Sequence, residues 1–128
     1  MKVRSPYGGL LLEMYHYRIK SVDRVVDGDT IDVTIDLGFD IYHKTRVRLA
    51  GIDTPETRTR DLQEKAAGIR AKDYLTKRIE EANLITLQTE KTGKFGRYLG
   101  IVYADDVDLN QTLIEEGHAE VYGGGKRK

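Results

Sequence analysis

The sequence predicts an α+β fold in which a small β-barrel carries one long and one short helix. Residues 31–35 alternate apolar and polar side chains, as strands with one buried face do. Residues 62–83 lack proline and are rich in Ala, Glu, Lys and Arg, which favours one long helix. A chain of 128 residues can close one apolar core but not two independent ones, so a single folded domain is expected.

Three strands are expected before the long helix. Residues 15–26 are β-prone, and Asp27-Gly28 supplies a turn signal before the alternating stretch at 31–35. A second turn at 37–40 leads into a third strand at 42–52. The first half of the chain therefore predicts three consecutive strands joined by turns.

The third strand has two distinct faces and ends at a proline. Val47 and Leu49 share one face, while Arg46 and Arg48 lie on the other and are expected to point away from the core. Thr54-Pro55 ends the strand, because proline cannot donate to a neighbouring strand and restricts the residue before it. The polar loop that follows is a place where functional residues can sit.

The second half of the chain predicts two helices and three strands. The long helix is expected to bury one face, formed by Ala67, Ala71, Leu75, Ile79 and Ala82. Residues 84–88 and 98–103 are β-prone and flank a polar, glycine-containing turn, which is typical of a hairpin. Asp108 fits the N-cap of a short helix that ends at Gly117, and a last strand is expected at 118–122.

This order of strands and helices suits a five-stranded barrel of the OB type. We expect the barrel domain to occupy residues 15–122, with an N-terminal extension at 1–14 and a flexible tail at 123–128. Because the strand pattern begins only after Met14, that residue fits a natural start as well as Met1 does.

The amino-acid composition limits the classes of protein to which this chain can belong. The chain has 21 basic and 21 acidic side chains, so a nucleic-acid partner would be held by a local patch rather than by overall charge. The absence of cysteine excludes disulfides, cysteine nucleophiles and cysteine-based metal sites, and leaves oxygen ligands that favour a hard cation. Apolar runs are too short for a membrane span or a signal peptide, so we expect a cytoplasmic protein without a membrane partner. The oligomeric state stays open.

Four polar blocks have consistent chemistry, because together they supply carboxylates and guanidinium groups that can hold a cation and a phosphodiester. Each block alone fits a simpler role, such as a hairpin turn or a solvated strand arginine. The three histidines are scattered without ligand spacing, so none is assigned to a metal or to catalysis. The blocks are Asp27-Gly28-Asp29-Thr30, Arg48, Asp53-Thr54-Pro55-Glu56 and Lys94-Phe95-Gly96-Arg97.

In this order and at these spacings, the four blocks resemble the staphylococcal nuclease (thermonuclease) family across residues 15–122. The resemblance implies an OB-fold enzyme that hydrolyses phosphodiester bonds of DNA or RNA with Ca²⁺ as its cofactor. It also implies that Asp29, Asp53 and the backbone carbonyl of Thr54 are metal ligands, which suits a cation that takes carboxylate, carbonyl and water oxygens.

The same resemblance assigns catalytic roles. Glu56 resembles a water-positioning glutamate, and whether it removes a proton or only aligns the water stays open. Arg48 and Arg97 would grip the scissile phosphate, because a guanidinium can bond two phosphate oxygens at once. Substrate contacts are implied for Lys94, Phe95 and Tyr122.

A non-catalytic OB-fold module that binds nucleic acid or protein is the alternative from another class. Such modules usually lack several of the site residues, whereas this chain has the three acids and both arginines, which favours an enzyme. A purely structural barrel would leave the positions of these residues without an explanation. The sequence does not distinguish DNA from RNA, or endonuclease from exonuclease action.

Overall fold

The structure is a computed structural model that describes the backbone of residues 15–92 and 97–122 and the side chains of residues 15–89 and 98–122. The predicted N-terminal extension, the predicted tail, and the turn that holds Lys94 and Phe95 lie outside the described residues. No helix in the described part of the chain is long and apolar enough to cross a bilayer.

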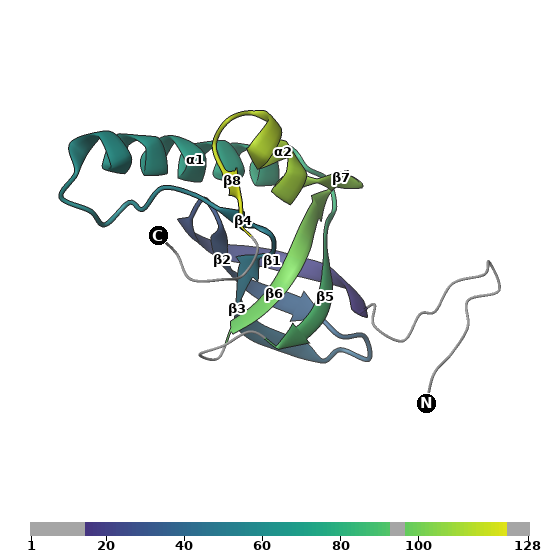
Figure 1. Cartoon of the computed structure of the whole chain (residues 1–128). Helices are drawn as coiled ribbons and strands as arrows, with labels where there is room; N and C mark the ends of the chain where they lie inside the picture. Colours follow the sequence, from purple (N-terminus) through teal and green to yellow (C-terminus); the bar gives the residue numbers. More distant parts are fainter. Residues whose placement is uncertain (1–14, 93–96, 123–128) are drawn as a thin grey trace.

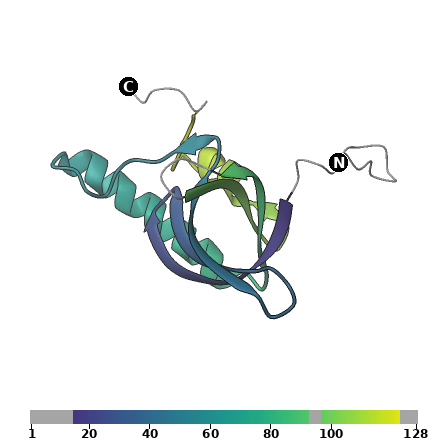
Figure 2. The same ribbon diagram turned by 90° about the horizontal axis from the view of Figure 1, so that it is seen from below.

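Five strands close into a barrel. Antiparallel pairing joins β1 to β2, β2 to β3, β1 to β5 and β5 to β6, and a parallel pairing of β3 with β6 completes the circuit. Figure 2 shows the ring seen nearly end-on. The predicted OB-type barrel is therefore confirmed. The strands are β1 (Tyr15–Asp27), β2 (Thr30–Asp36), β3 (Tyr42–Leu49), β5 (Ile85–Thr92) and β6 (Arg97–Ala104).

Both predicted helices are present, as α1 (Leu62–Glu81) and α2 (Leu109–Glu115), and both lie at one end of the barrel (Figure 1). The side chain of Asp61 caps α1 by accepting from two backbone N–H groups, and Asp108 caps α2 as expected. Gly117 follows α2 with a φ of +80°, a left-handed conformation that favours glycine.

Three two-residue strands complete the fold, and the last of them lies within the strand predicted at 118–122. The expected strand at 42–52 is interrupted by Gly51, whose φ is +78°, so that β4 (Ile52–Asp53) forms a separate short strand. This strand pairs with β8 (Glu120–Val121), whereas β7 (Val107–Asp108) pairs with the end of β6. The β4–β8 pairing brings residues 120–121 beside the segment that precedes Thr54-Pro55.

The core fills the barrel and extends to the helices. The inward residues of β2 and β3 alternate as predicted, and Val47 and Leu49 have no exposed surface. On α1, Ala71 and Leu75 are buried, whereas Ile79 and Ala82 pack on the core while partly exposed. The buried residues of the strands and those of α1 therefore pack into one hydrophobic cluster. This cluster holds one end of the barrel against α1.

Asn110 links α2 to the barrel through a buried side chain. Its Oδ1 accepts from the N–H of Val102 at 3.2 Å, and its Nδ2 donates to the carbonyls of Ala50 and Gly100 at 2.8 and 3.1 Å. Ala50 lies in the corner between β3 and β4, so one amide side chain fixes the position of β4 relative to β6.

Replacement of Asn110 by alanine is expected to lower the free energy of unfolding by about 2 to 4 kcal/mol, because three backbone groups each lose a hydrogen bond to its side chain. Urea denaturation followed by circular dichroism measures this loss. The matched control is Gln111→Ala, which changes an exposed neighbour on the same helix and should leave the free energy of unfolding nearly unchanged. Equal effects of the two substitutions would contradict the assigned role of Asn110.

Candidate active site

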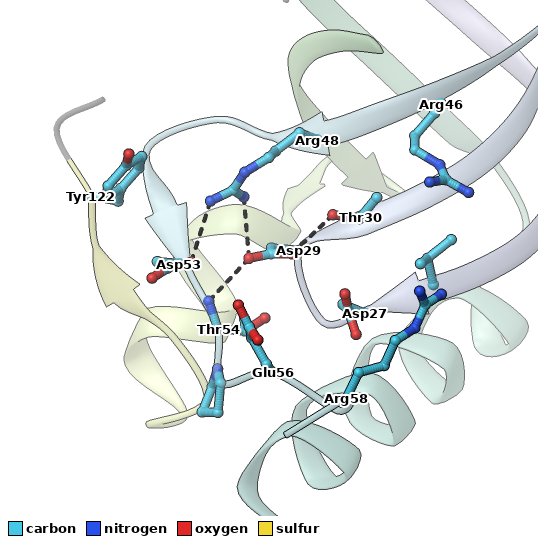
Figure 3. Close-up of a pocket in the computed structure, with 12 residues that line it drawn as sticks. Asp27, Asp29, Thr30, Arg46, Arg48, Asp53, Thr54, Glu56, Arg58 and Tyr122 are labelled. Carbon is cyan, nitrogen blue, oxygen red and sulfur yellow. Dashed lines mark hydrogen bonds and ion pairs between the residues drawn. The ribbon is translucent and has the colours of Figure 1, made fainter. Parts of the chain in front are cut away.

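A pocket of about 430 Å³ opens at the end of the barrel that carries β4. Its walls come from the turn between β1 and β2, from β3, from β4 with the following loop, and from Tyr122. Figure 3 shows the predicted acids and Arg48 pointing toward one another in this space. Segments separated by many residues in sequence therefore contribute polar side chains to one site.

Arg48 lies between two carboxylates. Its Nη1 is 3.1 Å from Oδ2 of Asp29, and its Nη2 donates a hydrogen bond to Oδ1 of Asp53 at 3.3 Å. Nη1 is buried and has no hydrogen bond of good geometry in the described structure, so its contact with Asp29 is an ion pair. The side chain faces away from the core, as expected, but it points into the pocket and is therefore only 12% exposed.

Asp29 connects three segments of the site. One carboxylate oxygen accepts from the hydroxyl of Thr30 at 2.9 Å, and the other accepts from the backbone N–H of Thr54 at 3.1 Å. Its backbone carbonyl accepts from the N–H of Leu49 at 2.8 Å. The β1–β2 turn, the end of β3 and the start of the loop after β4 are therefore fixed relative to one another through this residue.

Glu56 lies on an exposed loop whose backbone is anchored on both sides of it. The hydroxyl of Thr57 donates to Oδ1 of Asp27 at 2.6 Å, and the N–H of Glu56 donates to Oε2 of Glu64 on α1 at 3.2 Å. Asp27, which belongs to the first polar block but was given no role of its own, also lines the pocket. Glu56 thus belongs to the wall of the pocket and is held at a defined distance from α1.

Two glycines allow α1 and the site loops to approach closely. A Cβ added at Gly68 would lie 2.7 Å from the carbonyl oxygens of both Pro55 and Glu56. A Cβ added at Gly28 would lie 2.7 Å from Cβ of Ala71. Since both distances are shorter than real contacts of this kind, only glycine fits at these positions without displacement of the helix or the loops.

Two further arginines line the pocket and were not assigned to the site from sequence. Arg46 forms a bidentate pair with Asp32, in which Nε and Nη2 lie 2.7 and 3.2 Å from the two carboxylate oxygens. These hydrogen bonds lower the pKa of Asp32, and the same bonds raise the pKa of Arg46. The second of these two arginines is Arg58, which lies on the loop beyond Glu56. The two-residue offset from Arg48 had already placed Arg46 on the same face of β3, and this signal could have included Arg46 in the site.

Of the three residues predicted to contact the substrate, the structure describes one side chain and leaves two outside the described residues. Tyr122 lines the pocket, and the Cζ of Arg48 lies 5.6 Å from the centre of its ring, so these two residues are brought together. Lys94 and Phe95 lie outside the described residues. Arg97, predicted to be catalytic, begins β6, and its backbone is in parallel register with Arg46, but its side chain is not among those described.

The predicted metal ligands converge, and their chemistry fits a hard cation. Asp29 and Asp53 both reach one guanidinium, so their carboxylates face a common space. The hydroxyl oxygen of Thr54 is buried there without a hydrogen-bond partner in the described structure. No group of three or more His, Asp or Glu side chains among the described residues is arranged to hold a metal. A cation at this place would therefore take two carboxylates and complete its shell with backbone oxygens and water.

Comparison with known proteins identifies the family. A model of the staphylococcal nuclease homologue family matches residues 46–128. The chain belongs to this family. It is 33% identical over 109 residues to endonuclease YhcR of Bacillus subtilis, of which the match covers 9%, and 37% identical over 106 residues to the SPbeta prophage-derived endonuclease YokF of the same organism, of which it covers 33%.

A third relative in this family is endonuclease YncB of Bacillus subtilis, which is 35% identical over 108 residues. Each of these three matches spans 79% of this chain, but at most 46% of the relative's own length. The staphylococcal nuclease homologue family and its barrel are thereby established for this chain, as the sequence blocks predicted.

Proposed function

We propose that this chain is a nuclease that hydrolyses phosphodiester bonds of DNA or RNA and that its activity depends on Ca²⁺. The observation that carries the proposal is the guanidinium of Arg48 held between Asp29 and Asp53 in an open polar pocket that Glu56 also lines. Family membership and the endonuclease relatives support the same reaction class.

In this proposal the protein supplies two kinds of group. Asp29, Asp53 and the backbone carbonyl of Thr54 would hold the cation, which when bound polarises the phosphoryl group and stabilises negative charge. Glu56 aligns the attacking water from the loop wall, within a site that its anchored backbone keeps in shape.

The arginines act on the phosphate. Arg48 presents a planar fork to the phosphate oxygens, and its charge opposes the negative charge that develops as phosphorus becomes five-coordinate. Arg97 is proposed to add a second guanidinium, as the family resemblance implies. Departure of the 5′ oxygen of the next sugar would leave a 3′-phosphate on the product.

Calcium is expected to raise the melting temperature of the protein, because a ligand that binds the folded state alone stabilises it by about 2.7 kcal/mol at one hundred times its dissociation constant. Thermal denaturation with Ca²⁺, and with a chelator, measures this shift. It should disappear in Asp53→Asn and persist in Asp23→Asn, which changes an exposed carboxylate that does not line the pocket.

Digestion of plasmid DNA and of RNA under the same two conditions tests the reaction. Cleavage with Ca²⁺ that stops with chelator is expected. Binding of nucleic acid without cleavage in either condition would contradict the proposal and would indicate a non-catalytic binding module.

A further inference from the structure

Three of the arginines whose side chains the structure describes line the pocket, and two of these three are paired with carboxylates. Arg48 is paired with Asp29 and Asp53, and Arg46 is paired with Asp32. Among the described residues, the guanidinium of Arg58 has neither an ion pair nor a hydrogen bond, although the residue is exposed and lines the same pocket. Its charge is therefore the one most available to a bound anion.

The backbone at Arg58 is held in place on both sides. The preceding Thr57 donates to Asp27 at 2.6 Å, and Asp61, three residues later, accepts from the first turn of α1 as its N-cap. Figure 3 shows Arg48 entering the pocket from β3 and Arg58 approaching from the loop on the opposite side of Glu56. The two arginines therefore reach the pocket from different walls.

We propose that Arg58 binds the phosphate of a nucleotide adjacent to the one held by Arg48, and so gives the site a preference for oligonucleotides over single nucleotides. This inference rests on the proposed nuclease function and extends it to a second phosphate subsite. An exposed cation that contacts a non-reacting phosphate stabilises ground state and transition state alike, so it lowers KM and leaves kcat nearly unchanged.

Arg46 is the competing candidate for this role, and its pairing argues against it. Both of its hydrogen-bonded nitrogens face Asp32, so the pair is close to neutral and attracts a phosphate weakly. Arg58 has no such compensation in the described structure. Removal of the Arg58 charge should therefore weaken oligonucleotide binding more than removal of the Arg46 charge.

The test measures binding of a short single-stranded oligonucleotide by fluorescence anisotropy over a range of salt concentrations, in a Glu56→Gln background that prevents turnover. For Arg58→Gln we expect weaker binding. The slope of log Kd against the logarithm of the salt concentration should be smaller by about 0.7, which is the contribution of one phosphate contact in a single strand. Affinity for a nucleoside 5′-monophosphate, which carries no adjacent phosphate, should stay unchanged.

The matched control is Arg60→Gln, which removes the same charge from an exposed residue of the same loop that does not line the pocket. Equal salt slopes in Arg58→Gln and Arg60→Gln, or a parent protein that binds no oligonucleotide, would overturn the inference. If the salt slope depends on Arg58 but the protein with Glu56 intact never cleaves nucleic acid with Ca²⁺, the proposed nuclease function is overturned and the second phosphate subsite stands.

Discussion

Replacement of Arg48 by lysine is expected to lower kcat by about two to three orders of magnitude, the usual cost of removing one charged donor from a preorganised site. Lysine keeps the charge but loses the planar fork that spans Asp29 and Asp53 at 3.1 and 3.3 Å. A single ammonium cannot reach both carboxylates and a phosphate in the same geometry. The same loss is expected for Arg97→Ala.

Steady-state cleavage of an oligonucleotide with saturating Ca²⁺ measures this effect, and the melting temperature of each variant shows whether it folds. Arg46→Lys is the matched control, because Arg46 lies on the same face of β3 but is paired with Asp32 and is 46% exposed. It should change kcat little. A folded Arg48→Lys enzyme with nearly full kcat would remove Arg48 from the catalytic machinery.

The sequence predicted the barrel because its signals are local. Alternation along β2 and β3, the turn at Asp27-Gly28 and the amphipathic face of α1 each depend on neighbours a few residues apart. The short strands depend instead on pairing across the chain: Ile52 of β4 lies opposite Val121 of β8. A two-residue strand has too few residues to show a period, so the sequence predicted a strand at 118–122 but not its pairing with a separate β4.

The convergence of Asp29, Arg48, Asp53 and Glu56 was predicted through a family pattern, and the structure places all four in one pocket. The contacts that hold the pocket in shape escaped prediction for a physical reason. The hydrogen bond from Thr57 to Asp27 joins residues thirty positions apart, and no periodicity encodes it. Alternation also gave the face on which Arg48 lies without showing that the pocket would bury most of its side chain.

Gly68 gave a signal that could have been used, because glycine in the middle of a helix costs about 1 kcal/mol relative to alanine and needs a reason in the packing. The reason is the approach of the Pro55 and Glu56 carbonyls, which leaves no room for a Cβ. Both contacts are to backbone, so they cannot be relieved by rotation of a side chain. Any larger residue must push the loop that carries Glu56 away from α1.

Replacement of Gly68 by alanine is therefore expected to lower kcat by about one hundredfold, since a displacement near 1 Å at a reacting group has a cost of this size. Stability should change much less, because the helix gains about 1 kcal/mol of propensity that offsets part of the strain. Cleavage kinetics and thermal denaturation of the same preparation separate the two effects.

Ala66→Val is the matched control, since it adds bulk to an exposed position on the same helix away from the Glu56 loop. It should lower stability slightly, because valine is a weaker helix former, and leave kcat intact. If Gly68→Ala lost stability and kept kcat, the close packing of α1 would serve folding alone. Loss of kcat in a stable Gly68→Ala protein would instead show that α1 acts on the reaction through the position of Glu56.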